Sequence, residues 1–233
     1  MSLTYAQIVN RAAQEAKVPG FLDQAGEYLN MVLQDLALNY DFDLRHNDDF
    51  VIITNTVSPP EGPYPLPADY IRHVLREVRF IVNGEPYILF QVPLRTLKKQ
   101  FTGQGFTTFP QVFASDISDS GKSIFFWPPP NQAFEIEFPY YSGHTFEVDP
   151  ANSANVPWFP SSHYLIKATV ARLISGTDDD RAEKLRYESE QDLTKYMKMK
   201  DDNLGYAETV KLDSNNFAGR GELPGTKQNP WGG

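Results

Sequence analysis

The stretch SDSGKS at residues 118–123 contains the glycine, lysine and serine that a P-loop uses to bind nucleotide phosphates. A P-loop also needs a glycine five positions before its final glycine, because backbone amides cradle the phosphate there. Asp116 occupies that position, and its negative charge repels phosphate. The stretch also lies between two predicted strands instead of before a helix. We therefore interpret it as a β-turn with a surface lysine.

Histidines and acidic residues are the candidates for metal binding. No two histidines have ligand spacing on one element, such as i and i+4, although distant residues could still converge in the fold. An EF-hand loop that began at Asp178 would need glycine at its sixth position and glutamate at its twelfth. Glu183 and Ser189 stand there instead. Helix capping explains the acidic run 177–181 better, and we predict no metal and no cofactor.

Two sequence patterns are typical of hydrolytic enzymes. The G-x-S-x-G elbow that presents a nucleophilic serine is absent from the sequence. Paired carboxylates could cleave a glycosidic bond, and any two of the 30 acidic residues could meet in the fold, but no local pattern marks a pair. We therefore predict that the chain is not an enzyme and keep a carboxylate-based hydrolase as the alternative.

Aromatic side chains in the second half of the chain's β-rich region are candidates for ligand binding. We expect Tyr140 and Tyr141, with the nearby Phe138, to line the core or a contact between subunits. A module that binds a sugar or a receptor through Trp127 and the two tyrosines is the alternative. The WPPP stretch at 127–130 favours a rigid strand end over a polyproline ligand for an SH3-like groove.

The C-terminal stretch NNFAGRGELPGTKQNPWGG at 215–233 combines chain breakers with large apolar residues. Its glycines and prolines exclude a regular helix or a central strand, so we predict an extended arm over 207–233. Disordered tails, the alternative, are poor in aromatic residues, whereas interfaces are enriched in aromatics and arginine. We predict that the arm folds on a partner. The predicted partner-binding residues are Phe217, Arg220, Leu223, Pro230 and Trp231.

Length and composition limit the class of protein. The chain has 233 residues, of which 41% are hydrophobic, enough for one good core or two small ones. The absence of cysteine excludes disulfides and thiolate metal sites and fits a reducing cytosol. The net charge of −9 argues against tight non-specific DNA binding. The sequence lacks an apolar run of about 18 residues and a hydrophobic signal core, so we expect no membrane segment and no secretion signal.

Helical periodicity occurs at both ends of the chain. Near the N-terminus, Thr4 followed by Gln7 forms a capping-box pattern ahead of an apolar stripe. Near the C-terminus, a serine precedes and a glycine follows the first periodic segment, as helix caps do. The predicted helices cover residues 3–16, 23–39, 161–176 and 179–203.

The middle of the chain has the residue types and alternation of strands. An Asn83–Gly84 pair predicts a two-residue hairpin turn. We expect five to seven strands, joined by short turns, in a small antiparallel sandwich or barrel. The β-rich segments cover residues 49–58, 64–93, 109–130 and 133–143.

These elements predict an α+β fold. Residues 1–45 and 155–206 would form a discontinuous four-helix bundle from the N-terminal and C-terminal helical pairs. Residues 46–154 would form an antiparallel β domain that is inserted into the bundle and projects from it. Residues 207–233 would form the extended C-terminal arm.

This order of elements resembles that of the head-to-tail adaptor (connector) proteins of tailed bacteriophages, including the tail-tubular-A type of short-tailed phages. YPLPADYIRHV at 64–74 is similar to the entry into their first long β-hairpin. SIFFWPPPNQAFEIEFPYYS at 123–142 is similar to their strand, proline break and tyrosine-ended strand. SSHYLIKATVARLISGTDDDRAEKLRYESEQDLTKYMK at 161–198 is similar to their paired C-terminal helices.

The resemblance implies a virion structural protein of the head–tail interface that is made in the host bacterial cytoplasm. Such proteins form a homo-oligomeric, twelve-fold ring between the portal protein and the tail tube or nozzle protein. Genomic DNA passes through the ring without specific binding, and C-terminal arms grip the portal. The β region 49–143 is larger than the smallest adaptors need, which leaves its partner open. A phage-borne cell-wall hydrolase and a sugar- or receptor-binding module are the alternatives.

Overall fold

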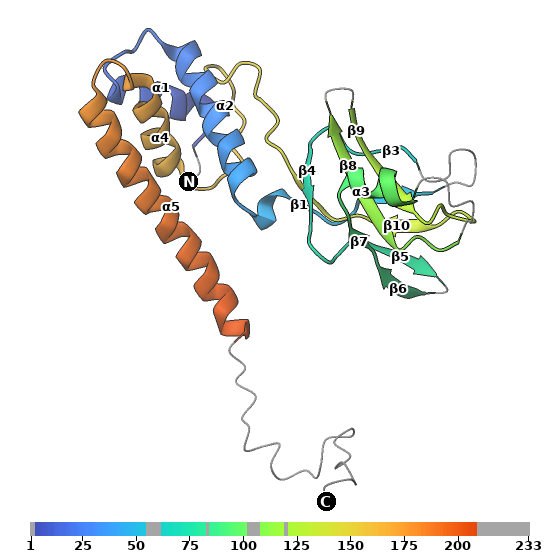
Figure 1. Ribbon diagram of the computed structural model, residues 1–233. Coiled ribbons are helices and arrows are strands. Elements are labelled where there is room, and N and C mark those ends of the chain that lie inside the picture. The colour runs from blue at the N-terminus through green and yellow to red at the C-terminus, as the bar shows by residue number, and fades with distance from the viewer. Residues whose placement is uncertain (1–2, 55–61, 83, 102–107, 119–120, 209–233) are drawn as a thin grey trace, which may run out of the picture.

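The structure, a computed structural model, describes residues 3–54, 62–82, 84–101, 108–118 and 121–208. It confirms the α+β class: long helices form one part of the molecule, the helical body, and short strands form the other, the β unit (Figure 1). The long helices are α1 (Tyr5–Glu15), α2 (Leu22–Asn39), α4 (Ser162–Ile174) and α5 (Asp179–Glu208). The short helices are η1 (Asp43–Arg45), α3 (Leu94–Thr96) and η2 (Leu97–Phe101).

One apolar core joins the helices from the two ends of the chain. Helix α4 packs against α1, α2 and α5, which is why segments far apart in sequence form one body. Ile8, Leu33 and Leu165, from α1, α2 and α4, are completely buried in this core. Each such side chain contributes about 1.5–3 kcal/mol. On the surface of the same body, Lys167 of α4 pairs with Asp192 of α5 at 3.0 Å.

The predicted helix ends are confirmed at three places. Thr4 and Gln7 form the capping box of α1, with bonds of 3.3 and 3.1 Å between each side chain and the other's backbone amide. Ser161 caps α4 by accepting from the amide of Tyr164. Asp178 accepts from the amide of Arg181 at the start of α5. The acidic run therefore caps a helix, as predicted, and such a cap stabilises by about 1 kcal/mol.

The β unit contains eleven strands among the described residues, more than the five to seven expected. They form three small sheets with the orders β1-β11-β4, β2-β10-β5-β6 and β3-β9-β8-β7. The first strands are β1 (His46–Asn47), β2 (Val51–Ile53), β3 (Tyr64–Pro65), β4 (Tyr70–His73), β5 (Arg79–Val82) and β6 (Glu85–Ile88). The others are β7 (Phe90–Gln91), β8 (Val112–Ser118), β9 (Gly121–Trp127), β10 (Glu135–Glu137) and β11 (Tyr140–Ser142).

The stretch 133–143, expected to be one strand, is split between two sheets. β10 pairs with β2 and β5, whereas β11 pairs with β1 and β4. Pro139 stands between them and has no amide hydrogen to continue a ladder. Alternation survives the break, because Ile136, Phe138 and Tyr140 are all buried in the β core. The alternation therefore predicts the buried face correctly, whereas the single strand expected here is two strands.

Both predicted hairpins are present. β5 and β6 pair with Val82 opposite Glu85, and Gly84 has a positive φ of 83°; residue 83 lies outside the described residues. β8 and β9 pair with Ser118 opposite Gly121, so the P-loop-like stretch spans a hairpin. Its lysine is not a free surface residue, since the ammonium group of Lys122 donates to the carbonyl of Ala68 at 2.6 Å.

One strand pair is parallel, which corrects the prediction of a purely antiparallel domain. β7 pairs parallel to β8, with Phe90 opposite Val112. Parallel neighbours need a long crossover, because the chain must return to the same end of the sheet. The described part of that crossover includes α3 and η2; residues 102–107 lie outside the described residues.

The boundaries of the helical bundle, the β domain and the arm stay a prediction. The helical body and the β unit have separate buried clusters, with a small third cluster under α3 around Leu97, Ala114 and Trp127. Helix α5 continues to Glu208, slightly past the predicted start of the arm at 207. Residues 209–233, which hold the predicted partner-binding residues, lie outside the described residues.

Candidate interaction surfaces

The junction between the helical body and the β unit is held by an arginine from each side. Arg72 of β4 reaches the end of α2, where it donates to the carbonyls of Leu38 at 2.9 Å and Tyr40 at 3.1 Å and pairs with Asp41. The last carbonyls of a helix lack intrahelical partners and attract cations. Arg72 therefore fixes the C-terminal end of α2 to the β unit.

Arg45 of η1 makes the reciprocal connection. Its Nε donates to the carbonyl of Ser142 at 3.1 Å, its Nη2 donates to Gly143, and its guanidinium lies 5.5 Å from the centre of the Trp158 ring. Burial lowers the pKa of Arg45, and the carboxylate of Asp69 opposes that shift. Guanidinium keeps its charge even so, because its ordinary pKa is above 12.

We expect Arg72→Met to lower the free energy of unfolding by about 1–3 kcal/mol, because the charged hydrogen bonds to the helix end are lost. Amide exchange in the last turn of α2 should accelerate, which hydrogen-exchange mass spectrometry measures. Arg79→Met is the matched control, since Arg79 forms an exposed pair with Glu137 and should cost less than about 1 kcal/mol. Equal losses in the two variants would argue against a special role for Arg72.

A buried amide holds the loop that leads from the β unit back to α4. Asn30 of α2 is 5% exposed. Its Nδ2 donates to the carbonyl of Glu147 at 2.9 Å, and its Oδ1 accepts from the amide of Glu147 at 3.1 Å. The Nε2 of His144 lies 3.0 Å from the same oxygen. Since that oxygen only accepts, His144 must donate from Nε2.

Acid should weaken this attachment through His144. Burial, followed by the nearby charge of Arg45, lowers the pKa of His144 to about 4 from its ordinary 6.5, and Glu147 opposes the shift. Below pH 6.5 the unfolded chain binds a proton on His144, whereas the folded chain binds it only when the pH is near 4. Stability is therefore complete above pH 6.5 and is lost as pH falls through that window.

Between pH 7 and pH 5 we expect the wild type to lose about 1 kcal/mol more than His144→Gln, with the value discounted because solvent screens a partly exposed ring. Urea unfolding at the two pH values measures the difference. Parallel losses in both proteins would show that carboxylates alone cause the acid sensitivity.

The loop that Asn30 holds exposes apolar side chains. Phe146 is 54% exposed and Val148 is 98% exposed. The acidic residues Glu147 and Asp149 alternate with them, and their carboxylates accept from Asn155 and Asn152. We refer to residues 146–149 as the apolar loop. It presents a protruding, nearly rigid apolar surface between two carboxylates.

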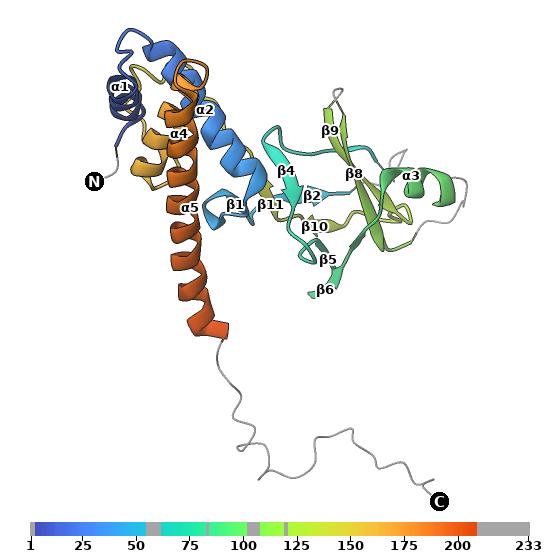
Figure 2. The same cartoon turned by 60° about the vertical axis from the view of Figure 1, so that its left-hand side comes forward.

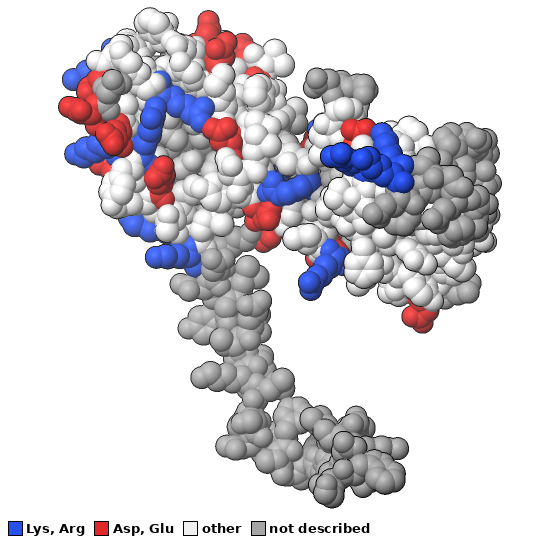
Figure 3. Space-filling model, viewed as in Figure 1, with Lys and Arg blue, Asp and Glu red and all other residues white. Residues whose placement is uncertain are grey.

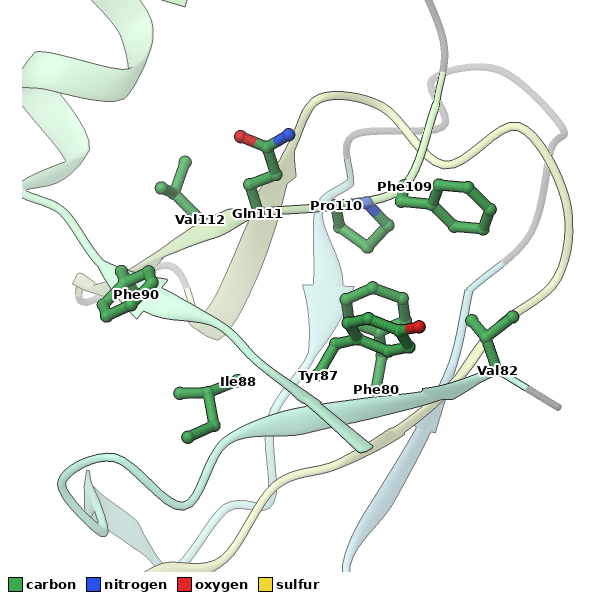
Figure 4. A pocket seen from close by; sticks show the side chains of 9 residues that line it. All are labelled: Phe80, Val82, Tyr87, Ile88, Phe90, Phe109, Pro110, Gln111 and Val112. Carbon is green, nitrogen blue, oxygen red and sulfur yellow. The ribbon is translucent and has the colours of Figure 1, made fainter. Parts of the chain in front are cut away.

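The β unit contains a second apolar surface, which is concave (Figure 4). We refer to it as the apolar groove; the residues labelled in Figure 4 line it, and its volume is about 420 Å³. Tyr87, Ile88 and Phe90 are each at least half exposed there. Strands β6 and β7 stand at the edges of their sheets beside the groove. Exposed apolar concavities of this kind mark binding sites.

Sequence reasoning did not predict this groove, although one pattern pointed to it. Residues 87–90 read YILF, which is four large apolar residues in succession. A strand with one solvent-exposed face would instead alternate apolar and polar residues. Only Leu89 of the four is buried. Phe80 closes the base, with its ring stacked on Tyr87 at 5.2 Å between centroids. Phe109 arrives from beyond the crossover, which no local pattern indicates.

The aromatic residues proposed for sugar binding have other roles. Tyr140 is 3% exposed and Trp127 is 7% exposed, so neither offers a face to a ligand. The hydroxyl of Tyr140 donates to Asp69 at 3.1 Å and accepts from Asn47. Burial, and then Asp69, raise the pKa of Tyr140 to about 12. Tyr141 lies between the His46 ring and the Arg72 guanidinium. The prediction that these tyrosines line the core is confirmed for Tyr140.

Three potential metal ligands converge that the sequence did not place together. Ligand atoms of His46, Asp48 and Glu77 lie within 4.8 Å of one another, and His46 contacts Asp48 at 3.1 Å. Both carboxylates are exposed. A structural zinc site needs four protein ligands, and the described residues bring only these three together. We assign no metal to the cluster.

Charged side chains of both signs are mixed on the face of the helical body shown in Figure 3. Much of the described surface of the β unit in that view is uncharged. The described helices include none that is both long and apolar enough to cross a bilayer.

A family model described as SU10 adaptor protein matches residues 3–211. The match covers the helical body, the β unit and α5. The chain belongs to this adaptor family. No similar protein was found among those with curated descriptions.

Membership in the SU10 adaptor family confirms the resemblance to phage head-to-tail adaptor proteins. The chain is a structural adaptor of a bacteriophage, associated with portal and tail components of the virion. The family match ends at residue 211, so it does not include the predicted partner-binding residues of the arm.

Proposed function

We propose that this adaptor forms a ring between the portal and the tail, extends the DNA channel, and docks on the portal with its C-terminal arm. The family match over residues 3–211 supports the ring part of the proposal, because it includes the helical body, the β unit and α5. The four long helices act as a bundle that builds the ring, and the β unit projects from it as a small sandwich. The role is structural and includes no catalytic step.

Helix α5 supports the assignment of the arm as the portal-binding segment. It has 30 residues and is about 45 Å long. Its C-terminal half extends beyond the other helices in both views (Figures 1 and 2). The end of α5 at Glu208 therefore lies well away from the helical core. Phe217, Arg220 and Trp231 are of the types that dominate interface energetics.

A ring makes weak contacts sufficient. A head-to-tail contact that closes under rotation repeats once in every subunit. Because the arms are linked through the ring, each arm binds the portal at a high effective concentration. A modest affinity per arm is therefore enough for a stable complex between ring and portal. The twelve-fold ring that the resemblance implies would match a portal of the same symmetry, and the β unit would face the tail tube or nozzle protein.

The net charge of −9 suits passage of DNA through such a ring. An acidic channel wall repels the phosphate backbone, so DNA slides through without specific binding. This part of the proposal requires that the acidic residues are biased toward the channel. A basic channel wall in the assembled ring would contradict it.

Electron microscopy of the purified chain mixed with portal rings of the same phage tests the proposed function. The expected result is one added ring of density on the tail-facing end of each portal, coaxial with its channel. Portals that stay bare at saturating concentrations of the folded chain would overturn the proposal.

A further inference from the structure

We propose that the apolar groove of the β unit binds the apolar loop of a second copy of this chain. The contact would be the repeating joint between neighbouring subunits of the ring, and in that respect it rests on the proposed function. The occupant is thus residues 146–149 of the neighbour. The inference adds to the proposed function the identity of the two surfaces that are in contact.

The groove is built to receive an apolar side chain from outside. Tyr87 and Ile88 are each 51% exposed and Phe90 is 67% exposed, although all three are large and apolar. The volume of about 420 Å³ falls within the range of cavities that bury a bound group. The side chains of Ile88 and Phe90 stand at one end and those of Phe109 and Val82 at the other (Figure 4).

The apolar loop has the matching shape. Val148 is 98% exposed, so its side chain protrudes completely. Asn30 fixes the adjacent residue, Glu147, through both its amide and its carbonyl. Docking therefore costs little conformational entropy, because the backbone beside Val148 is already held in place. A protruding apolar residue on a rigid support is unfavourable in water and favourable in a cavity.

The two surfaces are different and belong to different parts of the molecule. The segment between β11 and α4, which contains the loop, runs beside α2, whereas the groove lies among β5, β6 and β7 (Figure 1). Two unlike, complementary surfaces on one chain produce heterologous contacts, which close into rings when the rotation permits. A two-fold dimer would make the same contact twice between two copies and would stop there, whereas a ring joins each copy to two neighbours.

Charge complementarity supports the same pairing. Glu147 and Asp149 flank Val148, and the hydrogen bonds given above pair their carboxylates with asparagines. Arg76 is exposed in the adjoining cavity, which shares Ile88 and Phe90 with the groove. Within the described part of the chain, Arg76 makes no ion pair. A cation in the cavity next to the groove and anions beside the loop steer the two surfaces together.

Disulfide trapping tests the contact directly, because the chain has no cysteine of its own. The full-length double variant Val148→Cys with Ile88→Cys is oxidised alone and after addition to portal rings. If the loop enters the groove, the sulfurs of neighbouring copies come within bonding range. Non-reducing gels should then show a ladder well beyond dimers, since each copy is joined to the next.

Two kinds of control accompany the pair. Each single variant can yield dimers at most. The matched pair Val148→Cys with Ile117→Cys places the second thiol on β8 at a similarly exposed apolar residue, and it should give no ladder. Ile88→Asp should weaken self-association by about 10–100-fold, because it puts a charge into the groove. Unchanged thermal unfolding shows that these exposed substitutions leave the fold intact.

The outcomes separate this inference from the proposed function. Rings on the portal without a ladder, or with equal ladders from both cysteine pairs, overturn the inference and leave the proposed function standing. A ladder without portal binding supports the inference and overturns the proposed function. A chain that gives no ladder under either condition also overturns the inference. The inference is also overturned if Ile88→Asp still forms rings on the portal and loses only the binding of the tail protein. The groove would then bind the tail protein and not a second copy of the chain.

Discussion

Deletion of residues 209–233 is expected to abolish stable binding to the portal while the rest of the chain stays folded. The deletion removes Phe217, Leu223 and Trp231, and each anchor of this kind typically contributes about 1–4 kcal/mol. The loss should exceed a hundredfold in affinity, since every 1.4 kcal/mol is about tenfold. Among the described residues, the side chains that build the cores come from positions up to Met197, so we expect the shortened chain to fold.

Sedimentation of portal rings with the full-length and shortened chains measures this effect. The matched control keeps the length of the arm and changes Phe217, Leu223 and Trp231 to serine, which separates anchoring from tethering. We expect the triple variant to bind about as poorly as the deletion. A shortened chain that still assembles normally on portals would remove the arm from the proposed function but leave the ring possible.

Phe138→Ala is expected to lower the free energy of unfolding by about 3–5 kcal/mol. Phe138 is completely buried in the β core. Its ring meets those of Phe50 and Phe113 edge-on, with centroids 6.4 and 5.8 Å away, and it lies 5.8 Å from Tyr70. Truncation leaves a cavity among aromatic rings that cannot collapse to fill it, so the lost transfer energy and the cavity cost add.

Urea unfolding followed by near-ultraviolet circular dichroism measures the loss. Phe146→Ala is the matched control, because it removes the same atoms from an exposed site and should change stability by less than about 0.5 kcal/mol. A loss below about 1 kcal/mol for Phe138→Ala would mean that the β core is not packed as described. The same comparison tests whether the apolar loop serves assembly instead of folding.

The helices were predictable because their signals are local. The apolar stripe, the Thr4–Gln7 capping box and the cap at Ser161 each involve residues within one or two turns. Such interactions specify a helix wherever it packs. The two predicted hairpins were equally local, since a glycine at the turn determines which residues face each other.

The strands were harder to predict because the decisive interactions are distant in sequence. The break at Pro139 assigns β10 and β11 to different sheets, with partners near residues 50 and 80 on one side and 46 and 72 on the other. The parallel pairing of β7 with β8 depends on a crossover that no pattern of alternation reveals. Alternation reports which face a residue occupies but not which strand lies beside it.

The sequence by itself determined the α+β class, the helices at both ends, the capping role of Asp178 and the resemblance to phage adaptors. Only the tertiary structure decided which apolar residues remain exposed. Tyr87, Ile88 and Phe109 form a groove because a hairpin and a crossover bring them together, and Val148 protrudes because Asn30 of a distant helix holds its loop. Local free energies select helices and turns, whereas surfaces depend on contacts between segments that are far apart in the chain.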